Sequence, residues 1–131
     1  MAKFAFDLVS PERQLMSTDV DAVSAPGAEG DFGVYAGHAP MIASLRSGVV
    51  EIEGGEDGDQ RIYIAGGLAQ VTNERMVVLA EEAIMVADMD RDDLQQRIQN
   101  TKEDVEDAGD DETRRIAEAK LAHLEEMFAA I

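Results

Sequence analysis

Cysteine is absent from this 131-residue sequence, which rules out a disulfide framework and any cysteine-based metal site. No run approaches the ~20 consecutive apolar residues that a membrane-spanning helix needs. The first ten residues, MAKFAFDLVS, also lack the basic segment and the long apolar segment of a secretory signal peptide. Together these absences favour a mature, soluble, cytoplasmic protein.

Basic residues are scarce, with 11 Lys and Arg against 28 Asp and Glu and a formal net charge of −17. Residues 1–90 hold 16 acidic and 5 basic side chains, and residues 91–131 hold 12 and 6. This balance disfavours nucleic acid, whose phosphates require a basic footprint. It equally disfavours direct binding to anionic lipid headgroups. A protein partner with a basic surface fits better, and a plain role in solubility remains the alternative.

Short alternating segments separated by turns fill residues 3–87. In KFAFDLV, for example, Phe4, Phe6 and Leu8 occupy every second position, which predicts a strand with one buried face. In the loop at 54–59, Asp57-Gly58 suits the positive φ of a hairpin turn. Many short strands at spacings of about 8–12 residues predict a β-sandwich or barrel. The further expected strands are Gln14–Ser17, Val20–Ala25, Phe32–Tyr35, Met41–Leu45, Val49–Glu53, Arg61–Ala65, Leu68–Thr72, Met76–Ala80 and Ile84–Val86.

The periodicity becomes helical after Asp88. Gly109 is placed to end a first helix, and Asp110 or Asp111 to cap a second. A break this short makes the helices antiparallel with their apolar stripes facing. The stripes are Leu94, Ile98, Thr101, Val105 and Ala108 on the first helix, and Ala117, Leu121, Leu124, Phe128 and Ile131 on the second. The predicted fold class is therefore α+β, with an antiparallel β-sandwich over residues 1–88 and an antiparallel two-helix hairpin over residues 89–131.

Residues 26–40, PGAEGDFGVYAGHAP, gather glycines around one of the two histidines. A phosphate-binding loop is excluded, because no Gly-Lys-Ser/Thr follows and no Lys or Arg occurs between Arg13 and Arg46. His38 has no neighbouring Ser, Thr or Cys, so a structural or interface histidine is favoured over a general base. Glycines let a partner's backbone approach closely, and Phe32 and Tyr35 are suitable interface anchors. In the alternative reading Phe32 and Val34 point into the core, and alternate residues of one strand can do both.

Metal and catalytic sites are not indicated. Two distant histidines without cysteine make a poor metal site, and His123 is assigned no role. The loop Glu56-Asp57-Gly58-Asp59 lacks the ligand spacing of an EF-hand. We therefore predict no catalytic residue, no metal and no cofactor. Two alternatives stay open: a free-standing acidic β-sandwich that binds a small ligand or cation, and an enzyme with a deep pocket of convergent polar groups.

Four segments carry a family resemblance: FDLVSPER at 6–13, PGAEGDFGVYAGHAP at 26–40, IAGGL at 64–68 and VLAEEA at 78–83. They resemble the epsilon subunits of F-type ATP synthases, and the resemblance covers essentially the whole sequence. The absence of a transit peptide favours a bacterial epsilon over its mitochondrial counterpart, which is called delta.

The resemblance implies a non-catalytic subunit of the central stalk. The sandwich would bind the gamma subunit and the c-subunit ring, coupling proton translocation to ATP synthesis on the alpha/beta catalytic head. Such a subunit lies at the cytoplasmic face of the inner membrane and touches the membrane only through the complex. The resemblance places Glu29 and Asp31 towards the polar loops of the c ring and His38 towards gamma. With these, Phe32, Tyr35 and Met41 complete the expected partner-binding residues.

In many relatives the hairpin also inhibits ATP hydrolysis, and some relatives bind ATP through an Ile/Leu-Asp-x-x-Arg-Ala motif. The matching positions here are Met89, Asp90, Asp93 and Leu94, so a carboxylate replaces the cation that would meet phosphate. We therefore expect no ATP site.

Arg114, Arg115 and Lys120 are the candidate latch contacts with the catalytic head. The resemblance implies that these residues approach an acidic segment of the beta subunit in the extended form of the hairpin. Residues 91–131 carry a net charge of −6, from 12 acidic and 6 basic side chains, so long-range repulsion opposes that form. We expect weak or absent inhibition of ATP hydrolysis, with the hairpin in its folded form and not its extended form.

Overall fold

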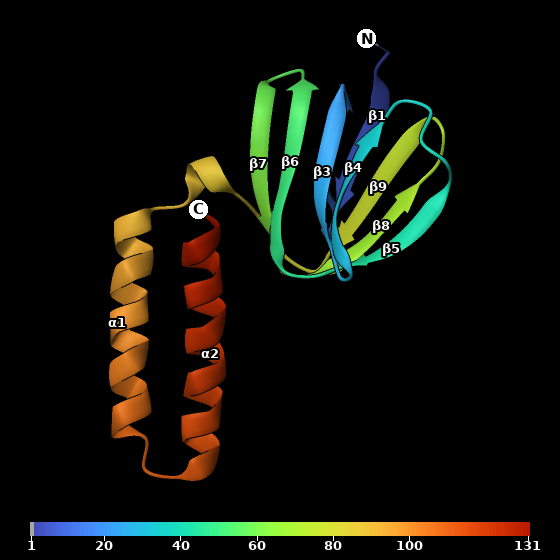
Figure 1. Cartoon of the computed structure of the whole chain (residues 1–131). Helices are drawn as coiled ribbons and strands as arrows, with labels where there is room; N and C mark the ends of the chain where they lie inside the picture. The colour runs from blue at the N-terminus through green and yellow to red at the C-terminus, as the bar shows by residue number, and fades with distance from the viewer. Residues whose placement is uncertain (1) are drawn as a thin grey trace. The chain divides into compact units, whose positions relative to one another are not determined.

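The structure, a computed structural model, describes residues 2–131. The protein divides into two compact units, one ending at Ala87 and the other spanning Asp88–Ile131. The first unit is a curled sheet and the second a pair of helices (Figure 1). The predicted β-sandwich followed by a two-helix hairpin is confirmed.

The first unit contains ten strands, and a short 3-10 helix spans its boundary with the second unit. The strands are β1 (Phe4–Val9), β2 (Gln14–Val20), β3 (Ala22–Gly27), β4 (Gly30–Tyr35), β5 (Met41–Leu45), β6 (Gly48–Gly55), β7 (Gly58–Ile64), β8 (Gly67–Val71), β9 (Arg75–Ala80) and β10 (Ala83–Met85), followed by η1 (Val86–Asp88). Their order in the sheet is β10-β7-β6-β3-β5-β8-β9-β1-β2, and β4 pairs with β3. Consecutive strands pair as hairpins in β1–β2, β3–β4, β6–β7 and β8–β9, whereas the other neighbours in the sheet are distant in sequence.

One pairing corrects the expectation of an antiparallel sheet. β1 and β9 run parallel, with Phe6 opposite Met76, whereas the other pairings described for residues 2–131 are antiparallel. These two strands are distant in sequence, so no hairpin fixes their relative direction. The sheet is therefore mixed.

The β6–β7 hairpin differs in detail from the sequence prediction. Gly55 pairs with Gly58 across the turn, and the register shifts between Ile52 and Gly55. Positive φ occurs at Gly58 (87°) and Gly54 (73°), whereas Asp57 does not adopt it. Glycine has no Cβ that would clash at positive φ, so Gly54 and Gly58 take the backbone conformation that this turn requires.

The inward face of each strand forms a single apolar core. In β1 the buried residues Phe4, Phe6 and Leu8 alternate with partly exposed ones, as the sequence pattern predicts. On the other face Asp7 pairs with Arg75 and accepts a hydrogen bond from the Ser17 hydroxyl at 2.7 Å. The large side chains that are completely or almost completely buried are Phe6, Val20, Val23, Val34, Val50, Ile52, Ile62, Tyr63, Ile64, Val71, Met76 and Val78.

The second unit consists of α1 (Arg91–Asp107) and α2 (Asp111–Ala130). Leu94 and Thr101 of α1 and Ala117 and Leu124 of α2 are buried, all four within the predicted stripes. None of the helices described in residues 2–131 is long and apolar enough to cross a membrane. The hairpin therefore forms by the facing of two amphipathic stripes.

The helix ends show which capping predictions hold. Asp90 caps α1 and Asp110 caps α2, where the Asp110 carboxylate accepts the Thr113 N–H at 2.7 Å. This bond to the charged carboxylate lowers the pKa of Asp110 from its ordinary value of 3.8. Gly109 follows the C-cap Ala108, but it does not take the positive φ expected of a terminating glycine. α1 instead ends as Ala108 turns to an extended conformation, φ −60° and ψ 127°.

At the open end of the hairpin, Arg91 of α1 contacts the end of α2. Its Nη1 donates a hydrogen bond to the Ile131 carbonyl at 2.8 Å. Its guanidinium lies over the Phe128 ring, 4.4 Å from the centroid. We call this pair of contacts the Arg91 clasp, because it joins the first turn of α1 to the last turn of α2.

Candidate partner-binding surface

The β3–β4 hairpin carries the first two predicted contact residues, Glu29 and Asp31. It closes with a Gly27–Gly30 pair, and Glu29 lies in the turn between them. A Cβ at Gly27 would lie 2.4 Å from the Gly30 carbonyl oxygen and 3.0 Å from the Phe32 ring. Glycine is thus required at position 27 for the strands to close and for the ring to lie beside the backbone.

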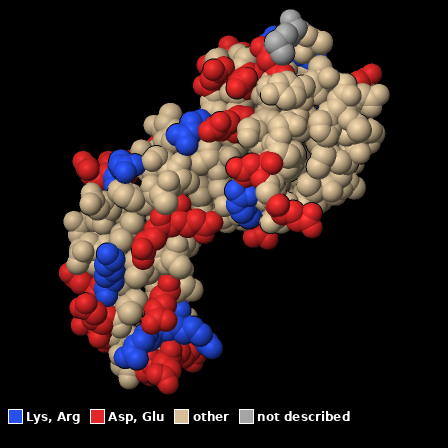
Figure 2. All heavy atoms as spheres, in the orientation of Figure 1, with Lys and Arg blue, Asp and Glu red and all other residues tan. Residues whose placement is uncertain are grey.

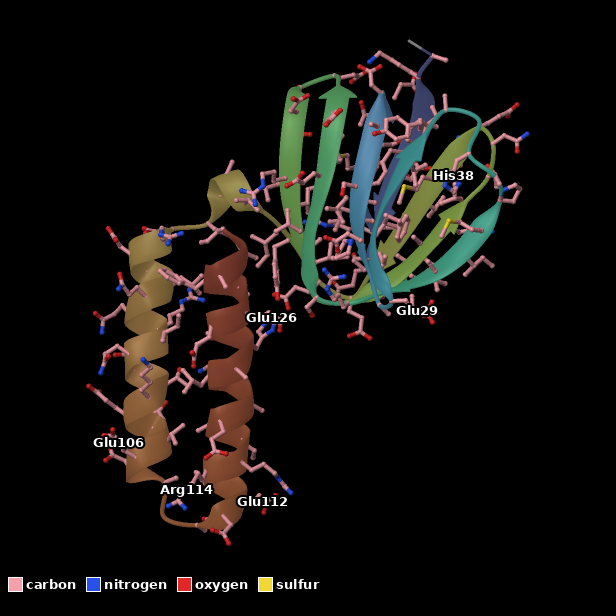
Figure 3. All side chains as sticks on the ribbon, viewed as in Figure 1. Glu29, His38, Glu106, Glu112, Arg114 and Glu126 are labelled. Carbon is pink, nitrogen blue, oxygen red and sulfur yellow. The ribbon has the colours of Figure 1, made fainter. Side chains whose placement is uncertain are left out.

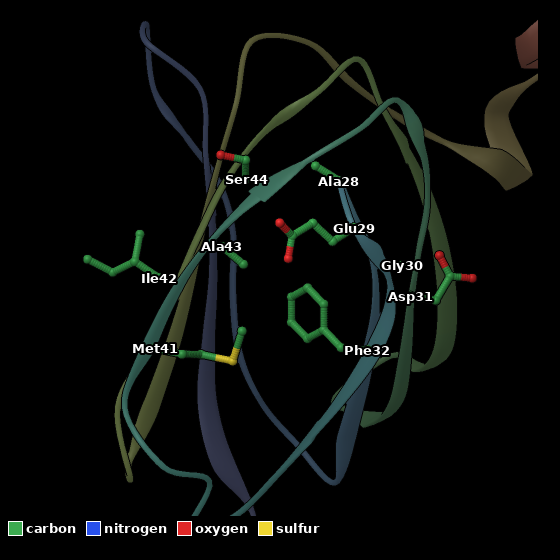
Figure 4. Close-up of a pocket in the computed structure, with 10 residues that line it drawn as sticks. Ala28, Glu29, Gly30, Asp31, Phe32, Met41, Ile42, Ala43 and Ser44 are labelled. Carbon is green, nitrogen blue, oxygen red and sulfur yellow. The ribbon is translucent and has the colours of Figure 1, made fainter.

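A hollow of about 570 Å³ opens between this hairpin and β5 (Figure 4). It is lined by residues 27–32 on one side and 41–44 on the other, and we call it the β4–β5 hollow. Its origin lies in the pairing, because β3 pairs with β4 along its whole length but with β5 only at Gly27 opposite Leu45. Phe32 and Met41 are half-buried in it and pack against the sandwich core.

The charges at the hollow are not equivalent. Arg46 makes an ion pair with Asp31 at 2.5 Å and also donates to the Gly27 carbonyl at 2.5 Å. Glu29 is exposed and, within residues 2–131, has neither an ion pair nor a side-chain hydrogen bond. Asp31 is therefore paired with a cation of the sandwich itself, whereas Glu29 is not.

Tyr35 is the last residue of β4, at the opposite end of the strand from Glu29. His38 follows it in the next loop and lies far from Glu29 in Figure 3. Tyr35 is 57% exposed, which suits an interface anchor. His38 is half-buried, with Nδ1 2.7 Å from the Ala39 carbonyl oxygen, and its backbone N–H donates to the Tyr35 carbonyl. Val34, next to Tyr35 in the strand, is buried, so alternate residues of β4 point inward and outward.

Sequence reasoning missed a second exposed surface on the sandwich. Ile42 of β5, Leu68 of β8 and Leu79 of β9 are 69%, 36% and 43% exposed. Leu68 pairs directly with Leu79, and Ile42 pairs with Gln70, so all lie on the outer side of the sheet. We call these three residues the outer apolar face. A signal was present in the sequence, since residues 76–80 are apolar at every position and a strand with one wet face alternates.

A smaller apolar hollow adjoins this face. It has a volume of about 270 Å³ and lies between residues 9–11 at the end of β1 and residues 79–81 at the end of β9. Leu79 belongs both to this hollow and to the outer apolar face. Exposed apolar side chains grouped on one sheet face are typical of protein contact surfaces.

The four residues that match the ATP-binding motif of some relatives lie at the start of α1. The Asp90 carboxylate accepts the N–H groups of Asp92 and Asp93, at 2.9 and 3.1 Å. Asp93 in turn pairs with Arg97 at 3.0 Å, and Leu94 is buried. Met89 is half-buried just before the helix. The segment therefore acts as a helix start.

The three candidate latch residues, Arg114, Arg115 and Lys120, lie exposed on α2. Arg114 is near the helix–helix turn, close to Glu112 (Figure 3). Within residues 2–131 none of the three forms an ion pair. On the face drawn in Figure 2, acidic side chains are spread over both units, with basic ones among them. In the described residues no three His, Cys, Asp or Glu side chains group as a metal site.

Comparison with known proteins defines the class. Residues 3–86 match the family described as ATP synthase, Delta/Epsilon chain, beta-sandwich domain. Residues 90–127 match the family of carboxy-terminal domains of the ATP synthase epsilon chain. The protein is thus a delta/epsilon-type sandwich joined to an epsilon-type helical hairpin.

Individual relatives agree over nearly the full length. The sequence is 47% identical to the ATP synthase epsilon chain of Parvibaculum lavamentivorans, over 95% of each protein. It is 44% identical to that of Mesorhizobium japonicum, over 98% of this protein and 95% of the relative. The protein belongs to the family of bacterial ATP synthase epsilon chains, which are non-catalytic subunits of the F-type enzyme.

Solved structures show the same arrangement of elements. A subunit of the Euglena gracilis mitochondrial ATP synthase, in an assembly with OSCP, F1 and c-ring, matches with a TM-score of 0.79 and 25% identity. That match covers 99% of this protein and 82% of the other. A subunit of the Tetrahymena thermophila mitochondrial ATP synthase central stalk and c-ring matches with a TM-score of 0.63 over 98% and 96% of the two proteins, at 14% identity. The second likeness concerns the fold alone.

Proposed function

We propose that this protein is a rotor subunit of the central stalk, coupling proton translocation through the c ring to ATP synthesis on the catalytic head. The observation that carries the proposal is the match of both units, in order, to the epsilon family. The Euglena relative was solved in an assembly that contains a c-ring, which supports the same setting for this protein. The role is mechanical, and the chemistry of ATP belongs to other subunits.

Two surfaces of the sandwich serve two partners in this proposal. The β4–β5 hollow, with Glu29 at its edge, faces the polar loops of the c ring. Tyr35 and His38, together with the outer apolar face, contact the gamma subunit. Covering exposed apolar side chains gives a stable interface, since each square ångström removed from water contributes about 25 cal/mol before the costs of association.

The hairpin contributes little inhibition in this proposal. Arg114, Arg115 and Lys120 form no ion pair with residues 2–131 and remain available to the alpha/beta head, but acidic residues surround them. Net repulsion between an acidic hairpin and an acidic target opposes the extended form, although salt screens it beyond about 8 Å. The facing stripes of α1 and α2 favour the closed hairpin.

An add-back experiment tests the coupling role. The endogenous subunit is removed from the ATP synthase of the source organism, and the full-length protein is returned while ATP hydrolysis and ATP-driven proton pumping are recorded together. Rebinding to the stalk with restored pumping supports the proposal. A protein that neither binds gamma nor restores pumping contradicts it, and favours instead a free-standing acidic sandwich that binds a small ligand or cation.

Variants of the full-length protein test the gamma-binding surface and the latch residues separately. Leu79→Asp places a charge on the outer apolar face and should weaken gamma binding, whereas Ile116→Asp on exposed α2 is the matched control. Replacing Arg114, Arg115 and Lys120 with Ala should leave the hydrolysis rate unchanged. A faster hydrolysis rate in that triple variant would show that the latch operates.

A further inference from the structure

We propose that Arg75 is a specificity-determining residue of the sandwich, and that its guanidinium donates hydrogen bonds to a backbone carbonyl of the gamma subunit at the border of the outer apolar face. Asp7 is its positioning residue. The inference rests on the proposed function, because it names one residue and one kind of partner group that fix how gamma lies on the outer apolar face.

Arg75 lies on the same side of the sheet as the outer apolar face. Positions 75, 77 and 79 of β9 alternate with the core residues Met76 and Val78, so their side chains point outward. Arg75 and Leu79 are both exposed, and half-buried Val77 lies between them. At about 3.3 Å per residue, Arg75 is about 13 Å from Leu79 along the strand. A standard interface buries about 800 Å² on each partner, so one partner can cover both residues.

The Arg75 guanidinium is held in place by a carboxylate that is itself fixed. Nη1 of Arg75 donates to Oδ2 of Asp7, and the Ser17 hydroxyl donates to Oδ1 of the same carboxylate at 2.7 Å. The Asp7 side chain is only 13% exposed, whereas the carboxylates of the other four ion pairs in residues 2–131 are 35–67% exposed. An arginine fixed in this way loses little side-chain entropy when a partner binds.

Arg75 also keeps hydrogen-bond donors for a partner. Within residues 2–131 its guanidinium bonds only to Asp7, so Nε and Nη2 have no acceptor in the protein itself. A guanidinium covered by a partner and left without an acceptor is costly. Arginine is enriched among the residues that dominate binding energy at protein interfaces. The partner therefore has to supply an oxygen atom at this point of the interface.

The charges around Arg75 favour a carbonyl over a carboxylate as that oxygen. Asp7 already compensates the charge of Arg75. Glu74 precedes Arg75 in the sequence, and Asp19 lies across β1 from it, opposite Ala5. A partner carboxylate would be repelled by these three acids, whereas a backbone carbonyl accepts the same N–H groups without a full charge. The partner group is thus a backbone carbonyl beside an apolar segment, which covers the outer apolar face.

The test measures rebinding of the labelled full-length protein to ATP synthase from which the endogenous subunit has been removed. Arg75→Gln should weaken rebinding about 10- to 100-fold, which is the loss of a charge-assisted hydrogen bond. Arg75→Lys keeps the charge without the planar fork and should recover only part of this loss. The matched control is Arg61→Gln, which removes an exposed arginine paired with Glu51 on β6, outside the outer apolar face, and should leave the affinity unchanged.

Two further measurements test the positioning role and the partner group. Asp7→Asn alone should weaken rebinding about two- to fivefold, and it should have no further effect in the Arg75→Gln background. A general loss of stability would not produce this coupling, because it would act in both backgrounds. The loss in Arg75→Gln should be equal at low and at high ionic strength, since a carbonyl carries no net charge.

Four outcomes would overturn the inference: full affinity in Arg75→Gln, an equal loss in Arg61→Gln, additive effects of the Arg75 and Asp7 variants, or a loss that shrinks with added salt. If Leu79→Asp abolishes rebinding while Arg75→Gln binds as the wild-type protein does, only this inference fails and the proposed function stands. A wild-type protein that does not rebind would overturn both.

Discussion

Removing the Arg91 clasp should loosen the helical hairpin by a predictable amount. In Arg91→Ala the hairpin loses the 2.8 Å bond to the Ile131 carbonyl and the contact with the Phe128 ring. A net hydrogen bond contributes about 0.5–1.5 kcal/mol, and a cation–π contact at an exposed site about 0.5–1 kcal/mol. Because Arg91 is exposed, solvent screening keeps both values near the low end. The expected loss is therefore about 1–2 kcal/mol.

The assay is native-state amide hydrogen exchange on the full-length protein, observed at Leu94, Thr101 and Leu124, which are buried between the helices. The predicted loss corresponds to exchange about 5- to 30-fold faster at these amides. Arg97→Ala is the matched control, since it breaks the exposed Arg97–Asp93 pair within one helix, worth about 0.3–0.5 kcal/mol. If Arg91→Ala accelerates exchange no more than Arg97→Ala does, the clasp does not hold the hairpin closed and the reasoning fails.

Three further predictions follow from single contacts. Gly67 has φ 155°, and a Cβ there would lie 2.2 Å from the Leu79 carbonyl oxygen, so Gly67→Ala should cost about 2–4 kcal/mol in urea denaturation. Gly37 has φ 81° and no atom within 4 Å of an added Cβ, so Gly37→Ala should lower the free energy of unfolding by only about 1–2 kcal/mol. Equal losses in the two variants would show that the added Cβ at position 67 does not clash. The lowered pKa of Asp110 means that its contribution to hairpin stability is complete above 3.8 and is lost as the pH falls through the lowered value. Asp110→Asn retains a capping side chain without titrating, so the acid loss of helical circular dichroism should be smaller in that variant than in Asp111→Asn. Calorimetric titration of ATP into the full-length protein should give no heat of binding, because the Asp90 carboxylate caps α1 and Asp93 pairs with Arg97; micromolar binding would refute this.

The parts of the fold that depend on local pattern could be predicted from the sequence. Alternation in residues 3–9 predicted β1, and the helical spacing after Asp88 predicted two facing stripes. Asp110 was one of two predicted caps for α2, and it is the one used. Each of these features is decided by residues within a few positions of one another, where side-chain period and capping chemistry dominate.

The parts that failed depend on contacts between distant segments. The parallel pairing of β1 with β9 joins opposite ends of the sandwich sequence, and no local residue indicates its direction. The end of α1 needed no left-handed glycine, because Ala108 could leave the helix through an extended conformation. The outer apolar face was missed because a fully buried strand and a strand with an exposed apolar face have the same apolar run in sequence.

The difference between Glu29 and Asp31 shows most clearly what the sequence alone cannot predict. In sequence they are two equivalent acids in one glycine-rich turn, and only a cation fifteen positions beyond Asp31 distinguishes them. Four of the five basic residues in positions 1–90 are already used in ion pairs: Lys3 with Asp21, Arg46 with Asp31, Arg61 with Glu51, and Arg75 with Asp7. The sandwich therefore has almost no cation left for its remaining carboxylates. A basic partner would complement such carboxylates, so the charge balance of the sequence predicts the kind of partner, whereas the folded structure adds which carboxylates have no cation of their own.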